Sequence, residues 1–395
     1  MANRPAPFPA LTRILSNFPR ITWLRLLSSW LIVGLFSAYG GQWLGEPLSA
    51  ITAGIIFLVL FTTILTASFG VVHEADHLAH QLGEPYGTLI LTLSIVVIEV
   101  ILIASVLLGP GEFPTIGRDS IFAVMMIILN LVMGVCLIAG SIRHGDQEYN
   151  AQGASAYLSM IFLLTSIALV LPNYTHMSGA FSATQAVGVS ILITLLYGGF
   201  LWLQMHSHRR YFVQPPKGLM TIQAAPCTGG PRHHSNGSAP APYVKGEVVM
   251  RFGILLALIL PIVLLSSHLA IVTDFGIAAS GAPAAVSGVL IAIIVFTPES
   301  ITAVKAAMNN EMQRAVNLCL GAFVSTVGLT VPAVLITGLI TGKQVIMGLS
   351  NADIVLFVIT AALSMLTFSG QRTSPIQGFM HLTLFAVFGL LLFYP

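Results

Sequence analysis

The stretch Gly83 to Leu108, which reads GEPYGTLILTLSIVVIEVILIASVLL, decides the fold. From Gly87 to Leu108 its residues are apolar, small or hydroxylated except for Glu99, and the run is long enough to cross a bilayer as one helix. At about 1.5 Å rise per residue, Glu99 lies ~18 Å along this helix, near the middle of a hydrocarbon layer of ~30 Å. A carboxyl group at that depth is costly to insert, so it is a candidate functional residue.

A second carboxyl group falls at a similar depth in another apolar run. Glu299 lies eleven residues after Gly288, within the sequence TPES at 297–300. Glutamates buried between helices can be structural, but intramembrane carboxylates are rare and generally functional. We therefore expect Glu99 and Glu299 to form one site.

The composition is that of a polytopic membrane protein. Of the 395 residues, 56% are apolar and 8% charged, and the mean hydropathy is +0.90. A net charge of +2 gives no indication of nucleic-acid binding, and three cysteines make no disulfide framework. At ~20 to 25 residues per span, we expect an all-α membrane protein of about 11 transmembrane helices.

Hydropathy and helix-breaking residues divide the chain into eleven expected spans. The long polar segment from about His208 to Gly246 is rich in Pro, Gly, Ser and basic residues, which predicts a disordered linker. The expected spans are 21–44, 50–80, 86–108, 118–142, 155–172, 183–206, 249–272, 282–307, 314–340, 351–369 and 375–394.

The linker divides the spans after the first into two groups of five. Because five is odd, the second group runs inverted with respect to the first. Inverted halves that meet at a polar site near the midplane are the architecture of secondary transporters. The expected organisation is an N-terminal segment 1–20, a leading helix 21–44, a first repeat 45–206, a linker 207–248 and a second repeat 249–395.

Basic residues are distributed unevenly between the two sides of this arrangement. With the N-terminus inside, only Arg118 and Lys343 fall on the outer side. By the positive-inside rule, this predicts a cytoplasmic N-terminus and linker, with the C-terminus on the opposite side. The residues on or near the cytoplasmic side are Arg4, Arg13, Arg20, Arg25, Arg143, Arg209, Arg210, Lys217, Arg232, Lys245, Arg251, Lys305, Arg314 and Arg372.

The two glutamates can hold protons or a hard cation, but not both together. Burial and a second carboxylate nearby favour protonated forms, whereas Ca²⁺ binds anionic and neutral oxygens. This exclusion is the chemical basis of exchange. Hydroxyls in membrane helices also bond to their own backbone, whereas an amide at the depth of Asn130 needs partners. The neutral oxygen groups at suitable spacing are Thr92, Ser94, Asn130, Thr297, Ser300, Asn317, Ser325, Thr326 and Thr330.

The segment His73 to His77 matches the HExxH pattern of zinc peptidases, with His80 close by. Since His73 and His77 share a helix face, an intramembrane metalloprotease is an alternative. The competing interpretation is the polar cytoplasmic end of a long second span, whose charged groups reach the lipid headgroups. We expect the second interpretation because no other motif supplies a clear third ligand.

Two longer stretches carry a family resemblance. They are ADHLAHQLGEPYG at 75–87 leading to Glu99, and PES at 298–300 followed by Arg314, Asn317, Gly321 and TVP at 330–332. In them the chain resembles the cation/calcium exchanger superfamily, specifically the bacterial calcium/proton antiporters that also handle sodium or potassium. There each half contributes a glutamate motif to a shared ion site, which implies Glu99 and Glu299 here. Asn130 matches a neighbouring asparagine of the family.

The chain departs from vacuolar-type members of that superfamily at two places. It has Ser325 where they have a glutamine, and VVI at 96–98 in place of their Gly-Asn-Ala before the first glutamate. Its central linker is basic and contains histidines, whereas relatives often have an acidic helix there. These differences bear on ion selectivity and regulation.

Residues and resemblance together predict an antiporter of a bacterial inner membrane, with a periplasmic C-terminus, in which proton influx drives export of Ca²⁺, Na⁺ or K⁺ by alternating access. Its partners are small cations, protons and the lipid bilayer, with no nucleic acid, cofactor or enzymatic activity. A channel or uniporter that uses the same carboxylates is the alternative, followed by the metalloprotease. The predicted ion- and proton-binding residues are Glu99, Glu299, Asn130, Ser325, Thr297, Ser300 and Thr92, with Glu99 and Glu299 as metal ligands.

Overall fold

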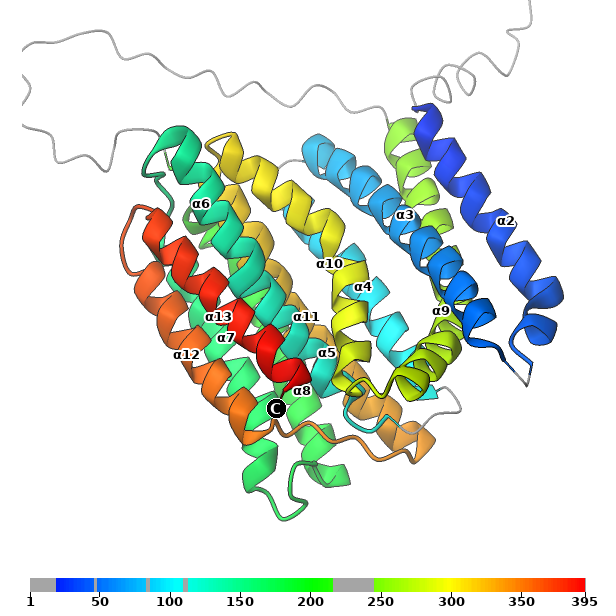
Figure 1. Ribbon diagram of the computed structural model, residues 1–395. Helices are drawn as coiled ribbons and strands as arrows, with labels where there is room; N and C mark the ends of the chain where they lie inside the picture. The colour runs from blue at the N-terminus through cyan, green and yellow to red at the C-terminus, as the bar shows by residue number, and fades with distance from the viewer. Residues whose placement is uncertain (1–18, 46–47, 83–85, 109–112, 216–244, 395) are drawn as a thin grey trace, which may run out of the picture.

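In the computed structural model the chain is almost entirely helical over the described residues, 19–45, 48–82, 86–108, 113–215 and 245–394 (Figure 1). Eleven helical segments cross the molecule and no β-strand occurs in these ranges, so the predicted all-α class is confirmed. The predicted N-terminal segment up to residue 18 and linker residues 216–244 lie outside them.

The helices follow the predicted order closely. A single turn, η4 (Arg209–Phe212), follows the sixth helical segment. The segments are α2 (Arg20–Trp43), α3 (Ala50–Leu82), α4 (Tyr86–Leu108), α5 (Ile116–Met125) with η1 (Met126–Val132) and α6 (Met133–His144), α7 (Ala151–Thr165) with η2 (Ser166–Val170) and η3 (Leu171–Tyr174), α8 (Ala183–Met205), α9 (Lys245–Ser280), α10 (Ala285–Met308), α11 (Met312–Thr341), α12 (Asn351–Thr367) and α13 (Pro375–Phe393).

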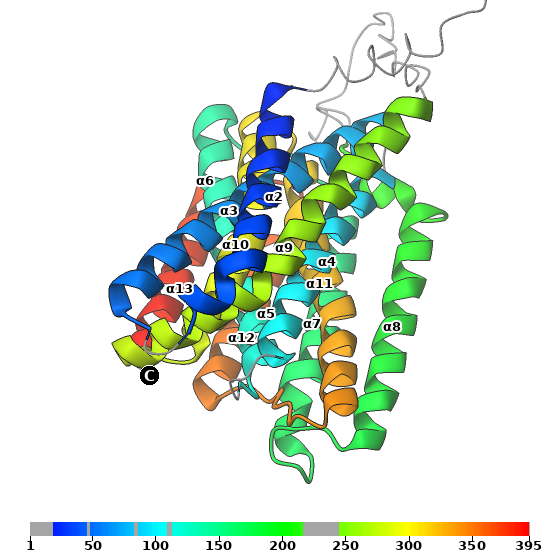
Figure 2. The same cartoon turned by 90° about the vertical axis from the view of Figure 1, so that its right-hand side faces the viewer.

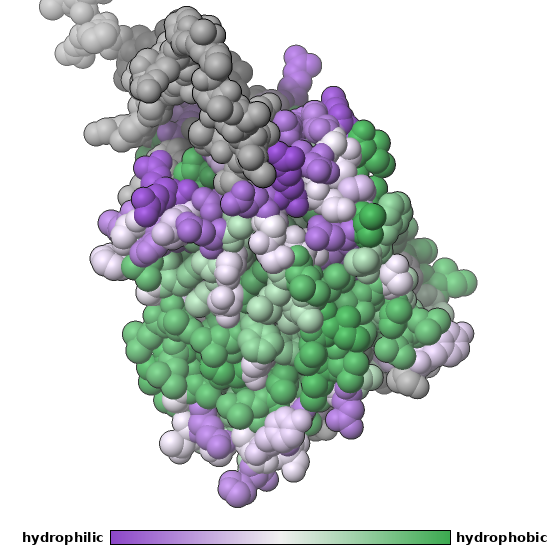
Figure 3. All heavy atoms as spheres, turned by 90° about the vertical axis from the view of Figure 1, so that its left-hand side faces the viewer, coloured by the Kyte–Doolittle hydropathy of each residue, from purple (hydrophilic) through white to green (hydrophobic). Residues whose placement is uncertain are grey.

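The apolar lengths of these helices fit a bilayer. In the described part of the chain, nine helices are long and apolar enough to cross one, and α12 and Leu93–Leu108 of α4 form shorter apolar helices. Figure 3 shows the matching surface, a hydrophobic belt between two hydrophilic ends. The chain is therefore a multi-pass membrane protein.

The helices form two groups. α3 and α9 pack along each other with α2 against them, and Figure 2 shows this group crossing the face of the molecule obliquely. The other group contains α4 to α8 and α10 to α13. Each predicted half therefore contributes one helix, α3 or α9, to the oblique pair.

Within the larger group the two predicted halves interleave. α4 packs against α11, and α10 packs against α5 and α6; α8 packs against α11, and α13 against α6. Each contact has a counterpart in the other half: the α4–α11 contact corresponds to that of α10 with α5 and α6, and the α8–α11 contact to that of α13 with α6. α4 and α10 run in opposite directions (Figure 1). This is the packing expected of inverted repeats.

Close approach of α10 to α5 depends on a glycine. A Cβ atom on Gly288 would lie 2.7 Å from the backbone of Asp119 and of Ser120. Small residues allow membrane helices to approach at their backbones in this way. The contact fixes the position of α10 well before Glu299.

The middle of the α5–α6 span is the π-helical segment η1. Its i→i+5 hydrogen bonds widen the turn by about one residue. Asn130 lies in this segment and is completely buried. The wider turn changes which side of the helix the later residues face, so regular helical spacing does not give the direction of their side chains.

Candidate ion-binding site

Glu99 lies in the middle of α4, the helix that packs on α11. Its side chain has an exposed fraction of 0%. Oε2 accepts a hydrogen bond from Thr326 Oγ1 at 2.7 Å, and the buried Thr330 hydroxyl, one helical turn later, has no hydrogen-bond partner within the described ranges. Oε1 has no hydrogen-bond partner among the described residues.

Glu299 lies in α10, directly after Pro298, and its exposed fraction is 3%. Neither of its carboxyl oxygens has a hydrogen-bond partner in the described part of the chain. The group lies within electrostatic range of the Glu99 carboxyl group. The structure thus brings two acids, one from each predicted half, into one buried region.

The unpartnered oxygens indicate what this region can bind. A buried oxygen without a hydrogen-bond donor is unfavourable unless the group is protonated or a cation supplies the missing contact. Two anions close together without a cation are still less favourable. The pair can therefore be neutral with protons bound, or ionised around a cation to which Thr326 adds a neutral oxygen.

Two buried thiols border the Glu299 side of this region. Cys319 of α11 lies within electrostatic range of both Glu299 and Cys136. Both are free thiols, and Cys136 belongs to α6. The sequence does not predict that these two cysteines lie close together, because they come from different halves of the chain.

Asn130 belongs to a different polar cluster. Its Nδ2 donates to Thr360 Oγ1 of α12 at 3.1 Å, and its Oδ1 lies 3.0 Å from Nδ1 of His381 in α13. Nε2 of His381 lies 3.0 Å from Thr367 Oγ1. Both ends of the Asn130 amide are thus engaged with α12 and α13, and the structure does not bring it to the glutamates.

Ser325 faces α8 instead of α4. Its hydroxyl donates to the carbonyl oxygen of Gly321 at 2.8 Å and accepts from Tyr197 Oη at 2.9 Å. The next residue, Thr326, is turned about 100° around the helix and reaches the carboxyl group on α4. Thr326 and Thr330 are four residues apart and therefore share one face of the helix. This spacing is the feature of the sequence that indicates which face of α11 meets α4.

Thr297 and Ser300 bond to the backbone of their own helix. Their hydroxyls donate to the carbonyl oxygens of Ile293 at 2.5 Å and Phe296 at 2.6 Å. This is the usual arrangement of hydroxyls in membrane helices. The side chain of Thr92, the remaining predicted ligand, lies outside the described residues.

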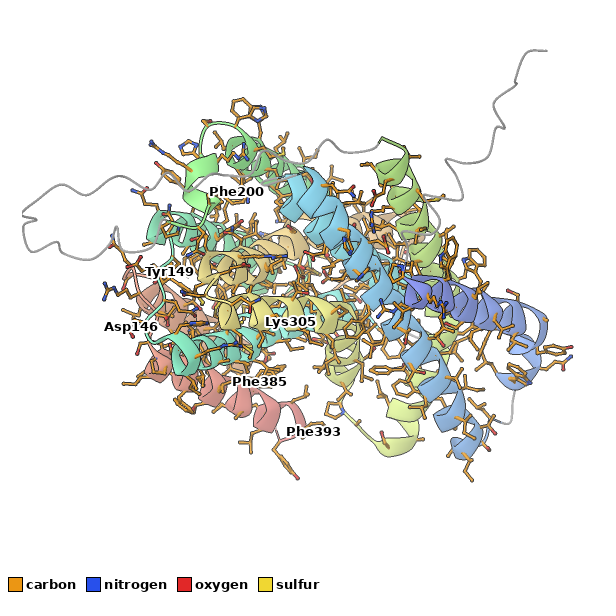
Figure 4. All side chains as sticks on the ribbon, turned by 90° about the horizontal axis from the view of Figure 1, so that it is seen from above. Asp146, Tyr149, Phe200, Lys305, Phe385 and Phe393 are labelled. Atoms are coloured by element: carbon orange, nitrogen blue, oxygen red, sulfur yellow. The ribbon has the colours of Figure 1, made fainter. Side chains whose placement is uncertain are left out.

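Thr297 and Ser300 also line an apolar groove of about 500 Å³. α10 forms it together with η1, α6 and α13. Figure 4 labels Lys305 and Phe385, which contribute to the groove from α10 and α13. The groove runs beside the helix that carries Glu299.

Two cavities lead from one end of the molecule toward the two acids. The outer one, about 410 Å³, lies between the beginning of α3, the end of α9 and the beginning of α10. A narrower one continues inward, and Phe57, Thr273 and Leu290 line both. Its lining includes Leu102 and Ile294, which lie within about two helical turns of the acids on α4 and α10.

The HExxH segment of α3 contacts neighbouring helices in the structure. Glu74 Oε2 makes an ion pair with Arg251 NH1 of α9 at 2.8 Å, and Glu74 Oε1 accepts from Thr22 of α2 at 3.2 Å. The rings of His73 and His77 are in contact, but among the described residues no three His, Cys, Asp or Glu side chains are grouped to hold a metal. Because Arg251 engages Glu74, this glutamate is not poised as the general base of a peptidase.

Known proteins resemble this chain along most of its length. The family described as sodium/calcium exchanger protein matches residues 52–206 and 250–394. The sodium-potassium/proton antiporter ChaA of Escherichia coli (strain K12) is 34% identical over 338 residues, covering 86% of this chain and 88% of ChaA.

Two solved structures have the same fold. The Ca²⁺/H⁺ antiporter protein YfkE superimposes with a TM-score of 0.67 at 16% identity, over 95% of this chain and 98% of that chain. The H⁺/Ca²⁺ exchanger CAX superimposes with a TM-score of 0.63 at 12% identity, over 93% and 88%. At these identities the likeness shows the fold alone.

Proposed function

The chain belongs to the sodium/calcium exchanger family, and on that premise we propose that it is a secondary antiporter that exports Ca²⁺ or a monovalent cation in exchange for protons. The relatives support cation exchange and leave the ion open: the E. coli relative is named a sodium-potassium/proton antiporter, and the two structures of like fold are calcium/proton exchangers. Exchange proceeds by alternating access to one buried site.

One observation carries this proposal: Oε1 of Glu99 and both carboxyl oxygens of Glu299 are buried without a hydrogen-bond partner in the described residues. Protons or a cation can satisfy these oxygens, and binding of one expels the other. A cation that is released outside the cell is therefore replaced at the site by protons, which are then carried to the cytoplasm. This competition couples the two fluxes.

The proposed site consists of Glu99, Glu299 and Thr326. The first repeat is 45–206, the second is 249–395, and α2 leads them. The separate family matches at 52–206 and 250–394 and the interleaved packing support this division.

The proposed location is a bacterial inner membrane, with the N-terminus in the cytoplasm and the C-terminus in the periplasm. The relative from E. coli supports a bacterial setting. The excess of Arg and Lys on one side supports the orientation. Arg118 in α5 and Lys343 just after α11 fall on the other, periplasmic side.

Cation-driven proton flux in everted membrane vesicles tests the mechanism. Glu99→Gln and Glu299→Gln keep the size of the side chain but cannot be ionised, so each should abolish the flux. The matched control is Glu148→Gln, because Glu148 lies in the connection before α7 and not in the buried region. Wild-type flux in either site variant would remove the proposed mechanism.

Purified protein in proteoliposomes identifies the ion. Proton release should follow addition of Ca²⁺, Na⁺ or K⁺ for each ion that competes with protons at the site. The channel alternative makes a different prediction, namely cation conduction without any proton movement in the same liposomes. An ion that moves without protons therefore contradicts the antiporter.

A further inference from the structure

The two acidic side chains of the HExxH segment form ion pairs with different helices. Glu74 pairs with Arg251 of α9, whereas Asp76 Oδ1 makes an ion pair with Arg314 NH2 of α11 at 2.7 Å. Residues two apart on a helix point about 200° apart, so the two acids lie on opposite sides of α3. One side of this segment faces the partner helix of α3 in the oblique pair, and the other faces the larger group.

The ion pair on the first side is buried and holds α3 to α9. The side chains of Glu74 and Arg251 are 0% and 7% exposed. Arg251 also contacts Glu247 at 2.9 Å, and Gln81 of α3 donates to the same Glu247 at 3.0 Å. Separating such a pair would leave an unpaired charge buried, which is strongly unfavourable. α3 and α9 should therefore stay together in any movement.

The ion pair on the second side is partly exposed to solvent. The side chains of Asp76 and Arg314 are 31% and 30% exposed, and Arg314 has a second acidic neighbour, Glu311, at 3.4 Å. Partly solvated ion pairs contribute little net stability because water replaces the partner at small cost. This contact can break and form again, unlike the one to α9.

The other end of α3 borders a cavity. The outer cavity lies between the beginning of α3, the end of α9 and the beginning of α10, while the Asp76–Arg314 pair lies near the end of α3. The oblique pair is thus tied to the larger group at the cytoplasmic end and leaves space at the other end.

We propose that the Asp76–Arg314 ion pair is a latch that closes the cytoplasmic side of the site. While it is formed, the α3–α9 pair is held against the beginning of α11 and the acids are approached through the cavities at the other end. Because the exported cation must enter the site from the cytoplasm, the latch must break and reform once in each transport cycle. This inference rests on the proposed antiport function.

A reversible crosslink tests the latch. The long Arg314 side chain spans most of the distance between the two helices, so cysteines at positions 76 and 314 would be too far apart for a direct disulfide. A short bis-methanethiosulfonate reagent should bridge them in the Asp76→Cys/Arg314→Cys variant, in which Cys227, the third cysteine of the sequence, is also replaced by Ser. The buried Cys136 and Cys319 are left in place, and the two single-cysteine variants report any unwanted labelling.

The expected result is loss of cation-driven proton flux after crosslinking and its return after dithiothreitol. The matched control is Gln81→Cys/Glu247→Cys, which bridges α3 to α9 inside the pair that moves together, and its flux should be unchanged by the reagent. Full flux through the crosslinked Asp76/Arg314 variant, or failure of that variant to crosslink at all, overturns the latch.

Charge exchange gives an independent measurement. Asp76→Arg alone places two cations together and should lower the flux by about fivefold, whereas Asp76→Arg/Arg314→Asp restores the attraction and the flux. Equal flux in the single and double variants contradicts the latch. If the wild type itself shows no cation-driven flux, the proposed function fails, which is a different outcome from antiport that is insensitive to the crosslink.

Discussion

Thr326 shows how one hydroxyl tunes a buried carboxyl group. It donates a 2.7 Å hydrogen bond to Glu99, and Val would fill nearly the same space without the donor. An unpaired buried acceptor costs about 1–3 kcal/mol. We therefore expect Thr326→Val to raise the cation concentration for half-maximal proton release by about fivefold or more in proteoliposomes.

Ser325→Ala is the control for this substitution. The Ser325 hydroxyl faces Tyr197 and the Gly321 carbonyl, so its removal should leave the half-maximal cation concentration unchanged. The reverse pattern, an effect at Ser325 and none at Thr326, would mean that α11 presents its other side to the ion.

At this scale the sequence indicates the acids more readily than their neighbours. Glu99 and Glu299 are recognisable because a carboxyl group in a long apolar run is rare. Of the adjacent hydroxyls Ser325 and Thr326, only the spacing of Thr326 from Thr330 favours one, and the rotation of α11 about its axis depends on tertiary packing. Both its depth and the family resemblance predict Asn130 as a ligand, and in the structure its amide is hydrogen bonded to Thr360 and lies 3.0 Å from His381 Nδ1.

The α5–α10 crossing is the element-scale feature most sensitive to a single methyl group. The Cβ of Gly288→Ala would meet the backbone of Asp119 and Ser120 at 2.7 Å, and backbone cannot move aside as a side chain can. We expect this substitution to cost about 1–3 kcal/mol, although alanine is the better helix former. Thermal unfolding of the purified protein in detergent should show a lower Tm.

Gly253→Ala separates packing from helix propensity. Gly253 lies in α9, and nothing lies within 4 Å of its would-be Cβ. The substitution should be neutral or stabilise the protein by about 0.5–1 kcal/mol. A Tm loss at Gly253 as large as that at Gly288 would refute the packing explanation.

At the scale of the whole molecule, the Glu74–Arg251 pair joins a helix of the first half to a helix of the second. Arg251→Met removes the cation and leaves Glu74 buried without its charge partner. The expected cost is about 3–5 kcal/mol, whereas the double variant Glu74→Gln/Arg251→Met should recover much of it because no lone charge remains. Thermal unfolding of the two variants in the same detergent measures the difference.

The recovery in the double variant is the decisive comparison. If Arg251→Met and the double variant lose the same stability, the lost contact is the packing of the arginine stem and not the ion pair. Additive losses from the two single substitutions would lead to the same conclusion.

The eleven spans could be predicted because hydropathy reports the part of each helix inside the lipid. It does not report where a helix ends. α9 was expected at 249–272, yet it runs from Lys245 to Ser280, since a helix continues past the apolar layer while its backbone remains hydrogen bonded. Pairing of helices, such as α3 with α9, depends on contacts between the halves that a linear pattern does not contain.

Because the halves interleave, we expect them to assemble even when the covalent connection between them is absent. Gln214 accepts a hydrogen bond from the Gln313 amide at the beginning of α11, so a break in the chain should come after Pro215. Of two polypeptides, one ending after Pro215 and one starting just before Lys245, the first would contain Glu99 and the second Glu299. Co-produced, they should copurify and restore transport, whereas either fragment alone should be inert.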